Sequence, residues 1–312
     1  MFIVALGEIM KIEIVLYLFI LSIPIIGCSS KPSNEGLPFI DVTKNYPEKE
    51  VDLTDIADVH YLYLSTKDED FLYKGSIDYV TQNTIVIVDR SSNSILFFSK
   101  QGEPKSRFNR RGQGPEEYSS ASTVMYDEAE DEVYIIPDFT DHIMVYSSSG
   151  EYRRKLTFPQ MNIMNQLAFF DKQSILVYDN TKLWKNINKQ HSGDKMVVAE
   201  HVNDSSFFLF SKADGKVLEY VELQSNNNIN VSTINQEHIF GQIGYARVRK
   251  CSDGLLLYNP ETDTVFLYNK DKSLIPFMHK KPLLRNLDPM AVMDICMDVG
   301  DFQFLSIYPE LL

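Results

Sequence analysis

The chain has 312 residues, of which 44% are hydrophobic and 12% aromatic, so it is long enough to bury a sizeable core. Its formal net charge of −13 at pH 7 argues against a nucleic-acid partner, because phosphate binding requires a basic surface. Tyrosine and phenylalanine are abundant, and glycine and proline punctuate the chain, as is typical of β-rich proteins.

The N-terminal segment predicts export. Residues 14–26 form an apolar run of 13, which is short for a membrane span but typical of the hydrophobic region of a signal peptide. Lys11 supplies the positive charge that precedes such a region. Translation from Met10 rather than from Met1 would give the more ordinary signal.

The apolar run ends in Ile25-Ile26-Gly27-Cys28, which resembles the bacterial lipobox. This resemblance implies cleavage before Cys28 and acylation of its thiol, with each acyl chain contributing roughly 0.8 kcal/mol per buried CH₂ group. An ordinary secretory signal followed by a coincidental cysteine is the alternative. We expect a signal peptide at residues 1–27, a lipidated cysteine and flexible tether at residues 28–50, and a folded domain at residues 51–312.

The other two cysteines, Cys251 and Cys296, show no repeated spacing. We expect two separate thiols, although an exported protein could pair them in a disulfide.

From residue 76 onward, short apolar runs separated by turn residues recur along the chain. An Asp or Asn closes the second run and a turn follows the third, with spacings of 13 from Asp89 to Gly102 and 12 from Asp138 to Gly150. The expected strands are, repeat by repeat, 77–80, 85–88, 95–99 and 104–108; 123–126, 133–136, 143–147 and 153–158; 166–170, 175–178, 207–210 and 217–221; and 246–250, 255–258, 265–268 and 274–279.

Four strands in a unit of about 40 to 50 residues predict an all-β fold, a β-propeller of four-stranded antiparallel blades. The alternation of apolar and polar residues excludes a helical repeat, and an ordinary β-sandwich is the alternative. A partial fifth repeat is expected from strands at 292–297 and 302–307. The alternating pattern at 59–65 predicts a lone strand that would join the last blade.

The order of these features resembles the bacterial six-bladed β-propeller lipoproteins, an exported family with NHL-like blades. The residues that carry the resemblance are DIADVHYLYL (55–64), RRGQGPEEY (110–118), hairpins of the FSKQGE type, and ETDTVFLYNKDKSLIPF (261–277). Members of that family continue into further blades, whereas this chain has about four complete blades and a partial fifth. The resemblance therefore implies a truncated product or an incomplete gene model, with an open strand edge at 302–307 that is liable to pair or aggregate.

A binding face is expected on the long connections. In a propeller, with strands A to D counted outward, the B–C and D–A connections emerge on one face and the A–B and C–D turns on the other. The long connections here (110–118, about 181–204, 223–245 and 280–291) all fall on the first face, and function concentrates on long loops over a rigid scaffold. The candidate binding residues are Arg110, Arg111, Gln113, Glu116, Glu117, Tyr118 and Trp184.

Each candidate also has a structural explanation. Gly112 and Gly114 would fix an unusual backbone course, and the charged residues around them would pair with one another or with the adjoining blade. Trp184 suits stacking on a sugar or peptide, but it could equally anchor its own loop. Asx-turns explain the recurrent residues Asp89, Asp138, Asp179 and Asn259, with a ring of Ca²⁺ ligands as the alternative.

No nucleophile elbow, HExxH motif or Cys–His signature occurs, so we expect no catalytic residues, no metal and no cofactor. The sequence favours a non-catalytic envelope lipoprotein whose propeller binds a glycan, a peptide or an envelope protein. A metal-dependent hydrolase or lactonase-like propeller is the alternative, and it would need inward-facing carboxylates such as Asp78 or Asp294. The residues after Cys28 lack the acidic run of a surface-export signal, so we expect an outer-membrane anchor that faces the periplasm.

Overall fold

The computed structural model describes residues 36–41, 43–44, 46–47, 50–66, 69–138, 140–158, 166–178, 207–223, 248–258, 264–282, 291–299 and 302–309. The chain divides into one unit at residues 1–36 and a second at residues 37–312, and the description below concerns the second. The lipobox and Cys28 lie outside the described residues. Within them, no helix has the length and hydropathy needed to cross a membrane.

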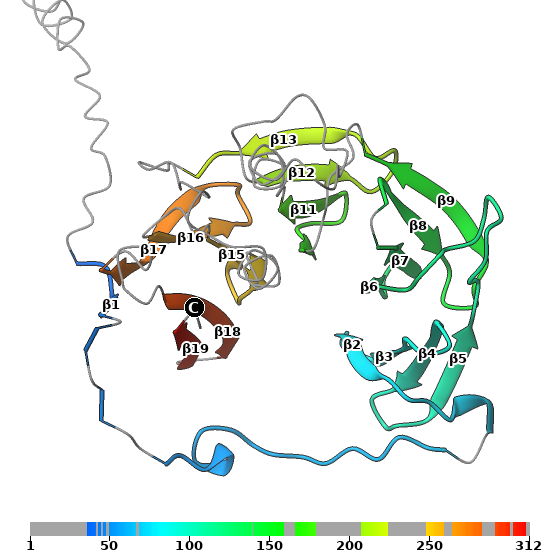
Figure 1. Cartoon of the computed structure of the whole chain (residues 1–312), viewed down its shortest axis with the longest axis horizontal. Coiled ribbons are helices and arrows are strands. Elements are labelled where there is room, and N and C mark those ends of the chain that lie inside the picture. Colours follow the sequence, from blue (N-terminus) through cyan, green and yellow to red (C-terminus); the bar gives the residue numbers. More distant parts are fainter. Residues whose placement is uncertain are drawn as a thin grey trace, which may run out of the picture. The chain divides into compact units, whose positions relative to one another are not determined.

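The described part is all-β apart from two 3₁₀ turns, Leu53–Asp55 and Glu69–Phe71 (Figure 1). Its strands form four antiparallel blades, each with strands A to D in chain order. Blade 1 holds β2 (Ser76–Val80), β3 (Thr84–Asp89), β4 (Ser94–Ser99) and β5 (Pro104–Phe108); blade 2 holds β6 (Thr123–Asp127), β7 (Glu132–Ile136), β8 (His142–Tyr146) and β9 (Tyr152–Thr157). Blade 3 holds β10 (Leu167–Phe169), β11 (Ser174–Tyr178), β12 (Phe207–Ser211) and β13 (Val217–Val221); blade 4 holds β14 (Val248–Lys250), β15 (Gly254–Leu257), β16 (Thr264–Asn269) and β17 (Leu274–Lys281).

Two further elements complete the described fold. β1 (Phe39–Asp41) adds a fifth strand to blade 4, and β18 (Ala291–Val299) pairs with β19 (Phe302–Pro309) in a separate two-stranded sheet. The prediction of an all-β propeller with about four complete blades is confirmed, and each expected blade strand coincides with an observed one to within two residues at either end.

The middle strands of each blade are apolar on both faces. Successive side chains of a strand point to opposite faces, so a continuous apolar run can fill two cores at once. In β3, Val86 and Val88 face blade 2, whereas Ile85 and Ile87 enter a separate cluster on the other side of blade 1. The same alternation in blades 2 and 3 builds three successive cores, between blades 1 and 2, 2 and 3, and 3 and 4.

Innermost strands of neighbouring blades also contact one another, in the pairs β2 with β6, β10 with β14, and β14 with β18. Blades that pack face to face and meet along their A strands are the arrangement of a propeller. Full burial of one large apolar side chain contributes about 1.5–3 kcal/mol, so these cores supply the main stabilisation.

A single C–D hairpin recurs in all four blades. The amide of its positive-φ residue donates to the carbonyl of the residue that ends or follows strand C, at 3.0 Å each time. That residue is Gly102, Gly150 or Gly215 in blades 1 to 3, with φ of +84°, +84° and +75°, and Lys272 in blade 4, with φ of 67°. Glycine adopts this left-handed conformation without the cost that a Cβ atom imposes, which explains its recurrence in the sequence.

Polar contacts join the D strand of each blade to the C–D hairpin of the next. The third position of β5, β9 and β13 provides the link each time: Ser106 Oγ donates to Ser148 O at 2.9 Å, Arg154 Nη2 donates to Lys212 O at 2.8 Å, and Lys272 Nζ donates to Glu219 Oε2 at 3.2 Å. These contacts fix the positions of adjacent blades.

Arg154 also holds the carboxylate of Glu132 in its own blade. Its Nη1 and Nη2 lie 2.5 and 2.7 Å from Glu132 Oε1 and Oε2, and the hydroxyl of Tyr134 donates to the same carboxylate. Burial raises the pKa of Glu132, but the hydrogen bonds from Arg154 and Tyr134 outweigh it and lower that pKa to about 2.

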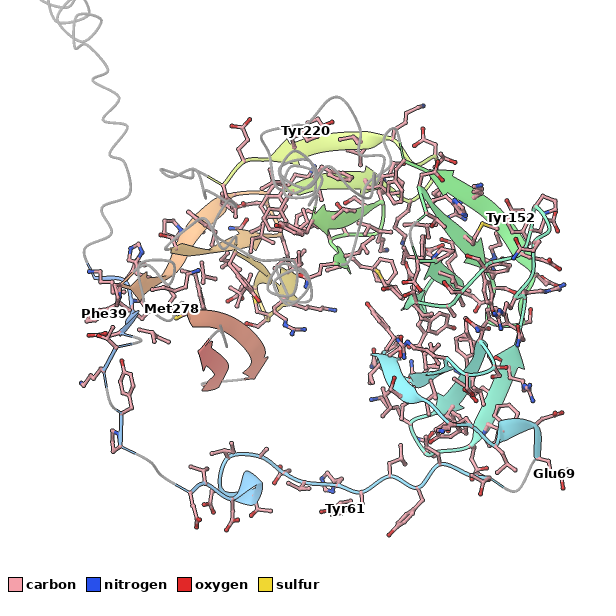
Figure 2. The ribbon with its side chains drawn as sticks, viewed as in Figure 1. Phe39, Tyr61, Glu69, Tyr152, Tyr220 and Met278 are labelled. Carbon is pink, nitrogen blue, oxygen red and sulfur yellow. The ribbon has the colours of Figure 1, made fainter. Side chains whose placement is uncertain are left out.

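The prediction of a strand at 59–65 is wrong. These residues form no strand; Tyr61 and Tyr63 are 87% and 88% exposed, and the amide of Ser65 donates to Gly102 O at 2.8 Å (Figure 2). An apolar residue of this pattern packs without forming a strand. Leu64 lies with Phe71 and Tyr73 on the face of blade 1 that is turned away from blade 2. The alternating pattern at 59–65 thus marked a buried side chain, but burial there did not require a hydrogen-bonded neighbouring strand.

The strand that joins blade 4 is instead β1, which runs parallel to β17 with Phe39 opposite His279 and Asp41 opposite Lys281. β1 lies within the segment expected as a tether, and the folded unit begins at Leu37.

The hairpin glycines provide a test of backbone conformation and packing together. A Cβ at Gly150 would lie 2.5 Å from Phe108 Cβ, whereas one at Gly215 would lie no nearer than 3.1 Å to any atom. Gly150→Ala should lower the free energy of unfolding by about 2–4 kcal/mol, and Gly215→Ala by about 1 kcal/mol, because both pay for positive φ but only the first also displaces a core ring. Urea unfolding measures both, and equal losses would contradict the close packing of Gly150 on Phe108.

The Glu132–Arg154 pair predicts acid sensitivity. The carboxyl has an ordinary pKa of 4.5 and a folded pKa of about 2, so its stabilisation is complete above about pH 4.5 and is lost as the pH falls toward 2. Glu132→Gln should therefore be less stable than wild type at neutral pH, and the difference should shrink on acidification. Thermal melts between about pH 7 and pH 2.5 measure it, with the exposed Glu103→Gln as the matched control; a difference that is constant with pH would contradict the assignment.

Candidate functional site

The described residues enclose a pocket of about 810 Å³ where the A–B turns of all four blades come together. Its walls are the ends of the A strands and the turns that follow them, at residues 79–83, 126–129, 169–172 and 250–252, with Gly254, Leu255 and Lys270. We call this the A–B pocket. It lies on the side of the A–B and C–D turns, opposite the loop at 110–118.

Glu128 links blades 1 and 2 at the wall of the pocket. Its Oε2 accepts hydrogen bonds from the backbone amide and the side-chain amide of Asn83 at 3.2 and 3.1 Å, and its Oε1 accepts the hydroxyl of Thr84 at 2.5 Å. Burial raises the pKa of this carboxyl, but these hydrogen bonds outweigh it, and the net pKa is lowered. Glu128 is thus held as a carboxylate by the neighbouring blade.

Asp127 is bound from the other direction, by Lys212 of the blade 3 hairpin. The Lys212 side chain is only 5% exposed, and its ammonium also lies 5.7 Å from the ring centroid of Tyr134 and 5.2 Å from that of Phe169. A buried ammonium requires such partners, because the cost of removing it from water is large. Burial, and then the nearby charge of Asp127, raise the pKa of Tyr79 to about 12.

Asp171, the third carboxylate of the pocket, is bound within its own turn. Its Oδ1 accepts the amides of Gln173 and Ser174 at 2.8 and 2.7 Å and the hydroxyl of Ser174 at 2.7 Å. Burial raises the pKa of Asp171, but the hydrogen bonds outweigh it and the pKa is lowered. The three carboxylates among the described residues of the pocket are therefore all hydrogen-bonded or ion-paired to other residues of the propeller.

On the opposite face, the loop that follows β5 is folded on itself around Tyr118. This ring is fully buried between blades 1 and 2, its hydroxyl donates to Asn93 O at 2.7 Å, and it accepts the amide of Arg110 at 3.1 Å. Burial raises the pKa of Tyr118 to about 12. Arg110 Nε donates to Gly150 O of the next blade at 2.9 Å.

Glu117 completes the internal structure of this loop. Its Oε2 accepts the amide of Gly114 at 2.8 Å, and a Cβ at Gly112 would lie 1.8 Å from the same oxygen, so a side chain at Gly112 would displace the Glu117 carboxylate. Arg110, Glu117 and Tyr118 thus form contacts within the loop and with the adjoining blade, as the structural explanation predicts. Arg111, Gln113 and Glu116 have exposed side chains with no partner among the described residues.

Trp184 and the connections at 179–206, 224–247 and 283–290 lie outside the described residues. The structure therefore describes one loop of the expected binding face and, in the A–B pocket, a wall formed by the A–B turns of all four blades. The sequence analysis missed this pocket because its turns are short; the signal was the charged or polar residues within these turns, among them Asn83, Glu128 and Asp171.

The repeated Asp and Asn residues do not all form the predicted Asx-turn. Asp89 forms the expected Asx-turn, since its Oδ1 accepts the amide of Ser91 at 2.9 Å; burial raises the pKa of Asp89, but hydrogen bonds from Ser91, Lys74 and Ser92 outweigh it and bring it to about 2. The prediction of an Asx-turn at Asp138 is wrong, because its carboxylate accepts the hydroxyls of Ser120 and Ser122 from the chain before β6. Asp179 and Asn259 lie outside the described residues.

The inward carboxylate proposed for a metal enzyme is paired. Arg90 Nη2 lies 2.7 Å from Asp78 Oδ2, and the side chain of Asp294 is outside the described residues. Within the described ranges, no three His, Cys, Asp or Glu residues are grouped as metal ligands. Cys251 packs at the edge of the blade 4 core.

Comparison with solved structures finds several that are similar to this chain. A protein described as exported, from Bacteroides fragilis, is 15% identical with a TM-score of 0.50, over 78% of this chain and 59% of that one. A DUF4221 family member from Bacteroides vulgatus is 12% identical with a TM-score of 0.41, over 68% and 59%; BamB from Moraxella catarrhalis is 12% identical with a TM-score of 0.35, over 64% and 51%. This chain thus spans about three fifths or less of each of these structures.

No curated protein matches the chain by sequence. The model of one family, described as "Domain of unknown function (DUF4934)", matches residues 37–281, which covers all four blades and begins at the first residue of the folded unit. The chain therefore belongs to the DUF4934 family.

Proposed function

We propose that this protein is an exported, lipid-anchored envelope protein whose propeller binds a ligand without catalysing a reaction. The observation that carries the proposal is the A–B pocket, in which every carboxylate is already held by hydrogen bonds from the scaffold. Its volume of about 810 Å³ falls in the range of small-molecule sites, roughly 300–1,000 Å³.

The directions of the pKa shifts favour binding over catalysis. A general acid or base works best with a pKa near the working pH, which requires a raised pKa for a carboxyl and a lowered one for a tyrosine. In the pocket the pKa values of Glu128 and Asp171 are lowered and that of Tyr79 is raised to about 12. These groups keep one charge state across the physiological range, as suits a fixed binding surface.

A second contact surface is proposed on the opposite face, where Arg111, Gln113 and Glu116 project from a loop that is rigidly held by Tyr118 and Glu117. Trp184 is the further candidate for this surface. A glycan, a peptide or an envelope protein are the proposed partners there, because exposed polar side chains on a fixed backbone provide hydrogen bonds without a large ordering cost.

The proposed location rests on the sequence before the folded unit. The run that ends in Ile25-Ile26-Gly27-Cys28 supports lipidation of Cys28, and the likeness to a protein described as exported agrees with passage through the inner membrane. We propose an outer-membrane anchor that faces the periplasm and a propeller of the six-bladed NHL-like lipoprotein type.

Lipidation has a direct test. The wild-type chain, grown with an alkyne-tagged fatty acid, should carry the label and partition into detergent, whereas Cys28→Ser should do neither because the acylated thiol is gone. Cys251→Ser serves as the matched control and should keep the label. An unlabelled wild type, or label that persists on Cys28→Ser, would refute the anchor.

Binding is tested by screening the full chain carrying Cys28→Ser on glycan and peptide arrays. A hit on the loop surface should be weakened about tenfold or more by combined Arg111→Ala, Gln113→Ala and Glu116→Ala, and it should survive Lys100→Ala on the other face. Saturable hydrolysis that a single substitution such as Asp78→Asn abolishes would instead establish the enzyme alternative.

A further inference from the structure

The charged residues that line the A–B pocket are formally balanced but not equally available. Three are carboxylates, Asp127, Glu128 and Asp171, and three are lysines, Lys172, Lys250 and Lys270. Each carboxylate is bound by donors of the scaffold, through Lys212, through Asn83 and Thr84, or within its own turn. These contacts occupy one or both oxygens of each carboxylate, and Glu128 and Asp171 keep their negative charge.

The lysines differ in this respect. Lys172, Lys250 and Lys270 are all exposed, and within the described part of the chain none of them has a hydrogen-bond or ion-pair partner. They come from two adjacent blades: Lys172 from the A–B turn of blade 3, Lys250 from the end of β14, and Lys270 from the C–D hairpin of blade 4. The charged groups of the pocket that have no described partner are therefore all cationic, on a chain whose formal net charge is −13.

The pocket walls bring these ammonium groups around one shared space. Each ammonium offers three donors on a flexible stem, so a shared anionic group can be reached from several turns at once. Beside the lysines, the pocket also exposes apolar surface from Val80, which is 50% exposed, and from the half-buried rings of Phe169 and Phe170.

We propose that the A–B pocket binds a small organic anion, whose carboxylate or phosphate group is held by Lys172, Lys250 and Lys270 while its body lies against Val80 and Phe169. The inference rests on the proposed binding function and names the ligand class of its pocket. The volume limits the ligand to a small molecule or the end of a short oligomer.

The test uses the full chain carrying Cys28→Ser and isothermal titration at low salt. The probes are a sugar acid (galacturonate), its neutral parent (galactose), a sugar phosphate (glucose 6-phosphate) and inorganic phosphate. We expect one of the organic anions to bind and galactose not to bind, with affinity falling as salt is added because exposed charges are screened. Which anion binds distinguishes a carboxylate from a phosphate ligand, and binding of inorganic phosphate alone would overturn the organic part of the proposal.

The pocket variant combines Lys172→Gln, Lys250→Gln and Lys270→Gln, and the control combines Lys74→Gln, Lys100→Gln and Lys155→Gln, three exposed lysines outside the pocket. Both change the net charge equally, and circular dichroism checks that both fold. The pocket variant should weaken the anion about tenfold or more, and the control less than about twofold, because only the first removes direct charge-assisted hydrogen bonds.

Equal weakening in both variants would show a general charge effect and overturn the proposal. So would unchanged binding in the pocket variant, or the absence of binding by every probe. If the arrays find a neutral glycan or a peptide whose binding ignores the pocket lysines, the proposed function stands and only the anion site falls. If neither the arrays nor the titrations find a ligand, the proposed function falls as well.

Discussion

The fold depends on the burial of each blade's middle strands on both faces. β3 sends Val86 toward blade 2 and Ile87 to the other side, so blade 1 cannot cover its own apolar surface. Each such side chain contributes about 1.5–3 kcal/mol only when a neighbour is present. Each blade is therefore stabilised by the neighbouring blade, as in other repeat proteins. The exposed link between Lys272 and Glu219 adds little energy by comparison and serves to set the position of the next blade.

The A–B pocket is a consequence of the same packing. Blades that pack face to face bring their A strands together at the inner edge, and the short turns that follow those strands then lie close to one another. Some polar residues on these turns contact a neighbouring blade. Glu128 binds Asn83 and Thr84 of blade 1, and Lys212 reaches from blade 3 to Asp127. These interblade contacts hold the turns of blades 1, 2 and 3 together at the pocket.

The sequence predicted the blades well because their information is local. Short apolar runs, an Asp at the end of strand B such as Asp89, and a glycine with positive φ in the C–D hairpin each act within about ten residues. The prediction from sequence failed where the contacting residues are far apart along the chain. The three residues of β1 carry no periodic signal and pair with β17 across most of the chain, and the pattern at 59–65 could not show that Leu64 packs on Phe71 without a strand partner. The pocket was missed because its turns are short and because Asn83, Glu128 and Lys212, which meet there, are far apart in the sequence.

Charged residues in this propeller fall into two physical classes. Glu128, Glu132 and Asp127 accept several short hydrogen bonds, and loss of one partner would leave the other desolvated and unpaired, so they fix the geometry of the blades. Lys172, Lys250 and Lys270 lie at exposed positions in turns or at a strand end where no described partner holds them, so the fold does not require their charge. A ligand gains free energy only from groups that the scaffold has not already used. The second class, although it resembles ordinary surface lysine in the sequence, therefore determines the selectivity of the pocket.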